Sequence, residues 1–386
     1  MNADALYRFE YLAPTKLVFG EGEISNIAKH LTFAEKILIV TGKNSALLSG
    51  ALPKVKDAFR HCQLSYFNGV TANPRASEVN SAAEIGIRDG VQAVMGIGGG
   101  SVLDAAKAVA ACIAAEGKVE PFLRNGIEAP DNTLPIICVP TTAGTGSEMS
   151  KGAIITDVEE QRKRGLRGAA LLPRLAIVDP ELTYSMPHHV TAETGFDIFT
   201  HAVETLVSKK ASALTAILSE YSIKAVIEYL PKVLQNLQNK TARRMLMLAS
   251  TIAGINLANS TTCLPHRMQY PLGAHTDCSH ARGLAALYKA WCEATAPHAV
   301  DKFALIAEML PGAPFSAQAT AAEKAQSIGE RVENFMKAVD VFHRMRDFGV
   351  MREMCKQMVH EIEGNLTTDP GETSDAALLK IYEASW

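Results

Sequence analysis

The chain has 386 residues, of which 47% are hydrophobic and 20% are charged. A chain of this length and composition buries a large core, and its length favours two domains over one. Because 38 Lys and Arg residues stand against 41 Asp and Glu residues, the net charge of -3 argues against nucleic acid and anionic membranes as partners.

The seven cysteines are an odd number, are widely spaced and include no C-x-x-C pair. This distribution is typical of reduced thiols rather than of a disulfide framework, so we expect a cytoplasmic protein. The first residues lack a basic stretch followed by an apolar one, and no run of about 18 apolar residues occurs later. We therefore expect neither export nor a membrane span.

Short apolar runs that end near glycine or proline alternate with helix-compatible stretches in the first half of the chain. These runs cover residues 36–42, 63–70, 93–101, 135–143 and 175–180. The pattern is typical of parallel strands in βαβ units. It predicts an α/β dinucleotide-binding domain with an open, mainly parallel sheet over residues 1–187.

Strand-like runs are no longer found after residue 190, where long helix-compatible segments begin. These segments cover residues 191–209, 211–238, 241–259 and 322–341. Prolines at 187, 231, 265 and 271 lie where we expect helix ends, because proline lacks the N–H that a helix interior needs. The pattern predicts an all-helical domain over residues 188–386, and we expect a ligand cleft between the two domains.

A glycine-rich turn, "MGIGGGSVLDAAKAVA" at 95–110, leads from a predicted strand into a predicted helix. Such a turn lets the backbone approach a phosphate, and the helix N-terminus offers free N–H groups. A tight turn without any ligand is the alternative. A second small-residue loop, "PTTAGTGSE" at 140–148, also follows a strand. Two such loops at strand ends favour a nucleotide site.

Asp197 and His201 are four residues apart on a predicted helix, so their side chains share one face. Alone, this pair is more typical of a solvated face or a local ion pair. His266 and His280 flank a Pro-Leu-Gly break at 271–273 and complete a candidate four-ligand metal site. One carboxylate and three imidazoles suit Fe, Zn, Co or Ni, with zinc preferred over iron thermodynamically. No glutamate stands out as a base for metal-activated water, so we expect Lewis-acid chemistry at a substrate oxygen.

These motifs, taken together and in order, resemble the iron-containing (group III) alcohol dehydrogenases over nearly the whole chain. The matching stretches are "GGGSVLDAAK" (98–107), "PTTAGTGSE" (140–148), "AIVDP" (176–180), "GFDIFTHAVE" (195–204) and the His266 to His280 spacing. The resemblance implies a homodimer that binds NAD(P)H and one divalent metal, by family Fe²⁺ with Zn²⁺ as the alternative.

The resemblance also implies a role for individual residues. The implied metal ligands are Asp197, His201, His266 and His280. The implied cofactor contacts are Gly98, Gly99, Gly100 and Ser101 at the pyrophosphate with Asp104 nearby, Thr141, Thr142 and Thr145 along the nucleotide, and Lys163 near its ribose.

The first departure from the family pattern lies at the end of the first predicted strand of a βαβ unit, residues 36–42, where many members have an aspartate. An aspartate there would bind the ribose 2′-OH and repel a 2′-phosphate. This chain has Gly42 instead, followed by Lys43, Asn44 and Ser45. We therefore expect Gly42, Lys43 and Ser45 to contact the cofactor and NADPH to be accepted as well as NADH.

The second departure is Tyr270, where many members place a histidine beside the substrate. A tyrosine can relay a proton, although its ordinary pKa of about 10 makes it a weak base at neutral pH. The neighbouring segment is similar to a subgroup that reduces phosphonoacetaldehyde or sulfoacetaldehyde, and Arg267 offers a fork for such an anion. The alternative is that Arg267 is a surface arginine, and Arg282 is the weaker candidate.

The leading hypothesis is thus a metal-dependent NAD(P)H oxidoreductase that interconverts a small aldehyde and a primary alcohol by direct hydride transfer. The substrate would be a small molecule, and the anionic acetaldehydes are the finer prediction. Two alternatives remain open at this point. One is a lyase of the dehydroquinate synthase type on the same scaffold, and the other is an inactive nucleotide-binding assembly protein.

Overall fold

The computed structural model describes residues 6–386 as two compact units. The sheet unit comprises Leu12–Pro187 and Leu237–Ala258. The helical unit comprises His188–Asn236, Asn259–Trp386 and the described residues before Leu12. The chain therefore leaves the sheet unit after Pro187 and returns to it for one helix, α8 (Lys240–Asn259).

The sheet unit is built on a six-stranded parallel sheet with the order β1-β8-β5-β4-β2-β3. The strands are β1 (Lys16–Phe19), β2 (Lys36–Gly42), β3 (Gln63–Val70), β4 (Ala93–Gly98), β5 (Ile136–Pro140) and β8 (Leu175–Val178). The five predicted strands and the open parallel α/β fold are confirmed. The order reverses between β2 and β4, because the chain runs from β2 outward to β3 and then returns to the other side of β2.

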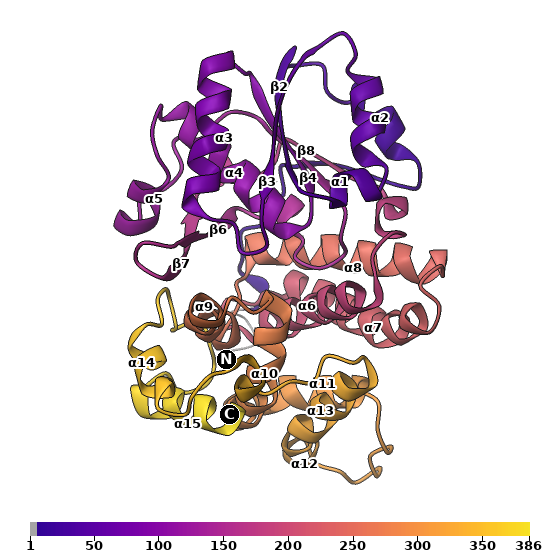
Figure 1. The fold of residues 1–386 in the computed structure, drawn as a ribbon. Helices are drawn as coiled ribbons and strands as arrows, with labels where there is room; N and C mark the ends of the chain where they lie inside the picture. Colours follow the sequence, from indigo (N-terminus) through magenta and orange to yellow (C-terminus); the bar gives the residue numbers. More distant parts are fainter. Residues whose placement is uncertain (1–5) are drawn as a thin grey trace. The chain divides into compact units, whose positions relative to one another are not determined.

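Helices cover both faces of this sheet (Figure 1). α3 (Ala76–Asp89) and α4 (Gly100–Ala114) pack on one face, and η2 (Glu23–Lys29), α1 (Ser45–Leu48) and α2 (Ala51–Ala58) pack on the other. Along β2, Leu38 and Val40 face the first layer, whereas Ile37 and Ile39 face the second. Burial on both faces explains why these strands appear in the sequence as continuous apolar runs.

An antiparallel pair, β6 (Gly152–Asp157) and β7 (Arg162–Arg167), and the edge strand β1 were not predicted. Both β6 and β7 mix polar with apolar residues, and only β6 has a strictly alternating burial pattern. The short helices α5 (Glu120–Asn125), η3 (Ser147–Met149), η4 (Ala169–Leu171) and η5 (Pro180–Thr183) fill the connections.

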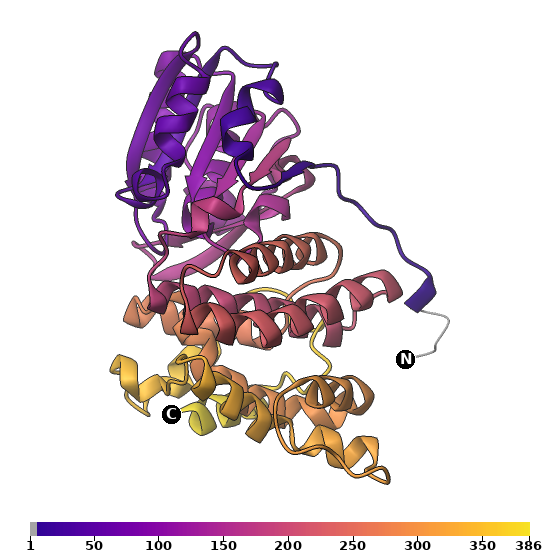
Figure 2. The same ribbon diagram turned by 90° about the vertical axis from the view of Figure 1, so that its right-hand side faces the viewer.

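The helical unit contains no strand among its described residues, which confirms the predicted helical second half. Its longer helices are α6 (His188–Val207), α7 (Ala213–Gln235), α9 (Leu264–Thr276), α10 (His280–Thr295), α11 (Val300–Met309), α13 (Ile328–Ala338) and α15 (Asp375–Ser385). The shorter ones are η6 (Ala296–His298), α12 (Ala321–Gln326), η7 (Met345–Phe348) and α14 (Met354–His360). Helix α10 is central, because it packs against α6, α9, α13 and α15. Figure 2 shows the helices of the second half of the chain in colours that run to yellow at the C-terminus.

Three expectations about helix ends were wrong. Pro271 lies inside α9 and Pro231 lies inside α7, so the Pro-Leu-Gly sequence does not interrupt its helix. Leu272 and Gly273 are buried, and the packing of this segment outweighs the missing N–H of Pro271. The segment 322–341 was predicted as one helix but forms two, α12 and α13, since the hydroxyl of Ser327 donates to the carbonyl oxygen of Lys324 and ends the first.

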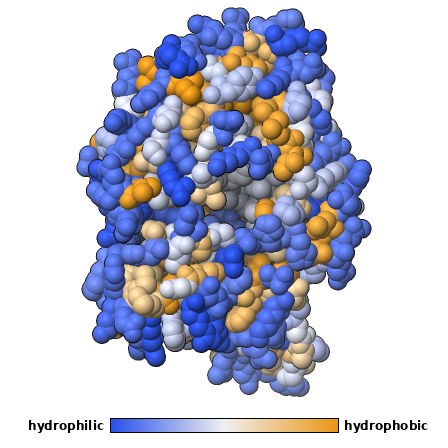
Figure 3. Space-filling model, in the orientation of Figure 1, coloured by the Kyte–Doolittle hydropathy of each residue, from blue (hydrophilic) through white to orange (hydrophobic). Residues whose placement is uncertain are grey.

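All seven cysteines are free, as the spacing predicted. None of the described helices combines the length and the apolar character that crossing a bilayer requires. The face of the molecule in Figure 3 is mostly hydrophilic, with hydrophobic residues scattered over it.

Candidate metal and nucleotide sites

Four predicted metal ligands come together in the helical unit. The ligand atoms of Asp197, His201, His266 and His280 all lie within 4.8 Å of one another. The Nε2 atoms of the three histidines lie 3.9, 4.0 and 3.8 Å, in chain order, from Oδ1 of Asp197. The imidazole rings of His201 and His266 stack with centroids 4.6 Å apart.

Three helices supply these ligands. Asp197 and His201 lie one turn apart on α6, so both project from the same face. His266 lies in the first turn of α9, and His280 is the first residue of α10, whose N-terminus is capped by the hydroxyl of Ser279. The side chain of His280 is 32% exposed, whereas the other three ligands are buried.

The geometry of the four donors fits a single divalent cation. Ligand atoms about 2.1 Å from a four-coordinate ion lie about 3.4 Å from one another. The observed separations are a little longer and exceed the length of a hydrogen bond, so the donors surround a common point instead of bonding one another. Nε2 of His266 is buried and has no hydrogen-bond partner among the described residues. A buried acceptor of this kind is costly unless a cation satisfies it.

The electrostatic environment also favours a neutral imidazole, which is the form that binds a metal. Burial lowers the pKa of His266 well below its ordinary value, and the neighbouring His201 and His280 lower it further. The carboxyl group of Glu204 behaves in the opposite way, since its burial raises its pKa well above the ordinary range.

Glu204 is a site residue that sequence reasoning missed. Its two carboxylate oxygens lie 2.8 and 2.9 Å from Nδ1 of His266, on the side of the ring away from the other ligands. Asp197, His201 and Glu204 follow the i, i+4, i+7 spacing of one helix face, which was the available signal. Glu204 faces Nδ1 of His266 and not the point that the four ligand atoms surround. The absence of a general base beside the metal therefore remains a prediction.

Arg267 is buried, with only 4% of its surface exposed, so the surface-arginine alternative is wrong. Its Nη1 donates to the hydroxyl oxygen of Tyr270 at 3.3 Å, and its Nε has no hydrogen-bond partner among the described residues. Tyr270 is 8% exposed and follows His266 by one turn of α9. Arg282 is engaged elsewhere, because its Nε donates to His343 and its guanidinium lies over the ring of Phe348.

The two glycine-rich loops of the sheet unit emerge side by side from β4 and β5. Gly98 and Pro140 are register partners in these neighbouring parallel strands, and the N–H of Thr141 donates to the carbonyl oxygen of Gly98 at 2.9 Å. A Cβ atom on Gly99 would lie 3.3 Å from the side chain of Thr142. The loops can therefore approach each other only because the first one lacks side chains.

The remaining predicted cofactor residues lie around these loops. A Cβ on Gly100 would overlap the side chain of Thr145, and Ser101 lies in the first turn of α4. Oγ1 of Thr141 is buried with no hydrogen-bond partner among the described residues, which fits a bound polar ligand. The carboxylate of Asp104 accepts from the hydroxyl of Ser147 and from the N–H of Ile154, so it also ties α4 to the second loop. Lys163 on β7 is buried and donates to Oδ1 of Asn73.

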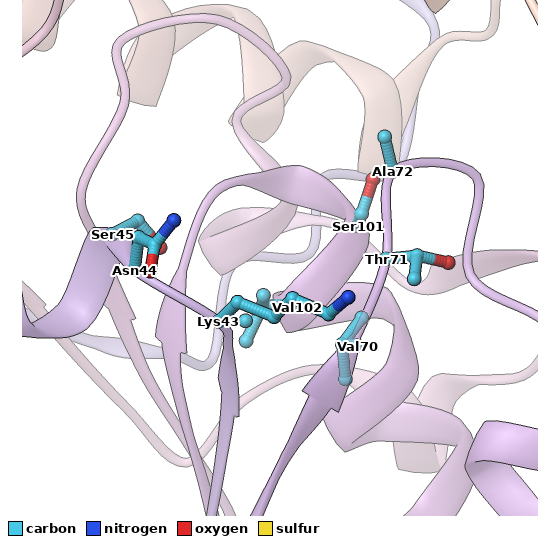
Figure 4. A pocket seen from close by; sticks show the side chains of 9 residues that line it. Lys43, Asn44, Ser45, Val70, Thr71, Ala72, Ser101 and Val102 are labelled. Atoms are coloured by element: carbon cyan, nitrogen blue, oxygen red, sulfur yellow. The ribbon is translucent and has the colours of Figure 1, made fainter.

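An open pocket of about 390 Å³ lies at the carboxyl ends of β2 and β3. It is lined by Gly42, Lys43, Asn44, Ser45, Val70, Thr71, Ala72, Ser101 and Val102. In Figure 4 the side chain of Lys43 extends across Val102 toward Val70 and Thr71. The strand order reverses between β2 and β4, and open α/β sheets bind their ligands beyond the strand ends at such a reversal.

Comparison with known proteins gives the same assignment for both halves of the chain. Residues 14–180 match the family described as iron-containing alcohol dehydrogenase, and residues 191–386 match the C-terminal domain of the Fe-containing alcohol dehydrogenase family.

Three relatives illustrate the similarity. The long-chain primary alcohol dehydrogenase AdhA of Thermoanaerobacter ethanolicus is 30% identical, over 98% of this chain and 97% of its own. The sulfoacetaldehyde reductase of Bilophila wadsworthia is 27% identical, over 98% and 99% of the two chains. The crystal structure of an archaeal halo-thermophilic alcohol dehydrogenase, ADH/D1 from a Red Sea brine pool, superposes with a TM-score of 0.92 at 27% identity, over 98% and 99% of the two chains.

The sequence left three hypotheses open: an oxidoreductase, a lyase and an inactive assembly protein. These matches favour the oxidoreductase. The two glycine-rich loops follow the neighbouring strands β4 and β5, and the four candidate donors lie together. The chain belongs to the iron-containing alcohol dehydrogenase family, and it is an alcohol dehydrogenase or aldehyde reductase of the iron type.

Proposed function

We propose that this enzyme interconverts a small aldehyde that carries an anionic group and the corresponding primary alcohol. When bound, NAD(P)H supplies the hydride and a divalent ion held by Asp197, His201, His266 and His280 polarises the substrate oxygen. The burial of Arg267 is the observation that carries the anionic part of the proposal.

A buried guanidinium is costly unless an anion or several acceptors satisfy it. No carboxylate of the described residues lies within ion-pair distance of Arg267, and its one hydrogen bond goes to the hydroxyl oxygen of Tyr270. The guanidinium therefore has donors left for a ligand. A phosphonate or sulfonate matches its planar fork, because two parallel N–H groups can bind two oxygens of such a group. The similarity to a sulfoacetaldehyde reductase supports the same substrate class.

The hydroxyl of Tyr270 is the group of this chain best suited to move a proton. Because Arg267 donates to the Tyr270 oxygen, the phenolic hydrogen remains free to be donated to another acceptor. We infer that Tyr270 delivers this proton to the substrate oxygen during aldehyde reduction and accepts it during alcohol oxidation.

The cofactor half of the proposal rests on the sheet unit. Backbone N–H groups at Gly99 and Gly100 and the N-terminus of α4 suit the pyrophosphate, and Thr141 offers an unsatisfied hydroxyl beside them. Lys43 brings a positive charge to the pocket at the end of β2, where a ribose 2′-phosphate of NADPH would fit. We propose that both NADH and NADPH are used.

The test of the substrate class compares sulfoacetaldehyde and phosphonoacetaldehyde with propanal. We expect Arg267→Met to lower kcat/KM for the two anionic aldehydes about 100-fold more than for propanal, since only the anionic substrates lose a buried charge contact. Arg282→Met is the matched control, because Arg282 contacts His343 and Phe348. Equal efficiency of the wild-type enzyme with charged and neutral aldehydes would refute the anionic substrate while leaving the reaction class intact.

A further inference from the structure

The imidazole of His266 is held from behind by a carboxylate that is not itself a ligand. Glu204 is fully buried, and both of its oxygens lie within 2.9 Å of Nδ1 of His266. One of the two oxygens also accepts the backbone N–H of Cys263 at 2.7 Å. The carboxylate is therefore fixed by α6 on one side and by the start of α9 on the other.

This contact determines which nitrogen of His266 is free to bind a cation. When Nδ1 donates its hydrogen to Glu204, Nε2 keeps its lone pair and directs it toward Asp197, whose Oδ1 lies 4.0 Å away. Nε2 is also the buried atom that lacks a partner. The contact of Glu204 with Nδ1 of His266 thus accounts for the free lone pair on Nε2 of the same ring.

The other two histidines are supported differently. Nδ1 of His280 lies 2.7 Å from Oε1 of Gln269, a neutral amide oxygen. Nδ1 of His201 is buried and has no hydrogen-bond partner among the described residues. Nδ1 of His266 faces a carboxylate whereas Nδ1 of His280 faces an amide, and a carboxylate makes an imidazole a stronger donor to a metal than an amide does.

We propose that Glu204 is a positioning residue that makes His266 the most strongly donating of the three imidazole ligands. Its two oxygens fix the ring through Nδ1 and are themselves fixed by the N–H of Cys263, so Nε2 is presented to the cation in one orientation. Glu204 thereby sets the affinity of the site for its metal. The proposal rests on the metal site but is independent of the substrate and of the cofactor.

The experiment measures metal binding to the purified apoprotein without substrate or nucleotide. Binding of Zn²⁺ and Co²⁺ is measured by competition with a chelator, and the visible absorption of the Co²⁺ form reports the ligand field. We expect Glu204→Gln to weaken binding by about 10- to 100-fold and to shift the Co²⁺ bands, because an amide of the same size offers one acceptor oxygen, and a weaker one, to Nδ1 of His266 and the N–H of Cys263. Gln269→Met is expected to weaken binding by a smaller factor.

Glu361→Gln is the matched control. Glu361 at the end of α14 lies 2.6 Å from Nε2 of His275 on α9, so the two form another carboxylate–histidine pair, outside the cluster of metal ligands. We expect this variant to bind Zn²⁺ and Co²⁺ like the wild type. An affinity of Glu204→Gln within about twofold of the wild type, or a loss in Gln269→Met as large as that in Glu204→Gln, overturns the proposal.

Thermal unfolding of each apoprotein separates metal affinity from folding, since Glu204 also holds the N–H of Cys263. If Glu204→Gln does not fold, Gln269→Glu carries the test, because it places a carboxylate behind His280. Tighter Zn²⁺ binding by Gln269→Glu supports the proposal, and unchanged or weaker binding overturns it. A protein that binds Zn²⁺ as proposed but reduces no aldehyde would refute the proposed function alone.

Discussion

The ammonium group of Lys107 lies 2.8 Å from the hydroxyl oxygen of Ser147, although the two residues are 40 positions apart in the chain. Lys107 is completely buried, and it also donates to the carbonyl oxygens of Ser150 and Gly152 and to the hydroxyl of Ser150. Burial lowers its pKa, while the nearby carboxylate of Asp104 opposes that shift. A single lysine thus connects the helix that follows the first glycine loop to the segment that follows the second.

Replacing Lys107 with Met should therefore disturb the nucleotide site from a distance. We expect the free energy of unfolding to fall by about 3 kcal/mol, because the oxygen acceptors of Ser147, Ser150 and Gly152 lose their charged donor. NADH binding, measured by fluorescence titration, should weaken about tenfold or more, and the metal content should stay unchanged. Normal NADH affinity in the folded variant would show that the second loop holds its shape without Lys107.

Gly254 on α8 should matter for the same loop. A Cβ on Gly254 would overlap the carbonyl oxygen of Gly146, and Gly146 itself has a φ of 61°, which only glycine adopts easily. We expect Gly254→Ala to weaken NADH binding about tenfold, although alanine favours a helix by about 1 kcal/mol. Gly86→Ala in α3 is the control, because there the new atom meets the flexible end of Ile113. Equal affinities of the two variants would contradict this expectation.

The metal cluster should be sensitive to any one of its ligands. We expect His266→Ala and Asp197→Asn to lose the metal and all turnover, as measured by elemental analysis and by NADH oxidation. His275→Ala should retain both, because His275 is on the same helix but pairs with Glu361. Removing the metal from the wild type with a chelator should lower its thermal stability by up to about 4 kcal/mol, a loss that added Zn²⁺ or Co²⁺ reverses. A fully active His266→Ala variant would exclude the assigned ligand set.

Lys43 should affect NADPH and not NADH. We expect Lys43→Ala to raise the KM for NADPH about tenfold, since a charged contact to the 2′-phosphate is lost, while the KM for NADH changes little. Lys56→Ala is the control, because Lys56 lies over the ring of Tyr66, outside the pocket. Identical effects on the two cofactors would place the 2′-phosphate elsewhere.

Tyr270→Phe removes one hydroxyl and keeps the ring. We expect kcat for aldehyde reduction to fall about 100-fold, the usual size of a lost proton donor, with metal content and NADH affinity unchanged. Single-turnover experiments measure the rate constant of aldehyde reduction on the enzyme and so separate proton and hydride transfer from product release. A variant as fast as the wild type would assign the proton to water or to the cofactor ribose.

Local patterns predicted the sheet well because burial on both faces leaves a continuous apolar run, as in the β2 residues Ile37 to Val40. The metal ligands could also be proposed from the sequence, since Asp197 and His201 share a helix face and His266 and His280 flank the Pro-Leu-Gly sequence. The family motifs contain the same four residues. Helical spacing places Glu204 on the face of Asp197 and His201, but its contact with Cys263 could not be predicted, because the two residues are 59 positions apart. The contact of Lys107 with Ser147, 40 positions away, likewise forms only in the folded chain. Pro271 was wrongly expected to end a helix for a related reason. The packing of α9 outweighs the local preference of proline for helix ends.

Helix α8 gives the chain an unusual constraint for engineering. It forms part of the sheet unit through contacts with segments far earlier in the chain: Ser250 accepts from Gly144, Thr251 donates to Glu148, and Arg243 donates to the carbonyl oxygen of Met186. A chimaera joined once, after Pro187, would combine the nucleotide half of one enzyme with the α8 of another and mismatch all three contacts. Exchange of cofactor preference between relatives should therefore succeed only when residues 237–258 are transplanted together with residues 12–187.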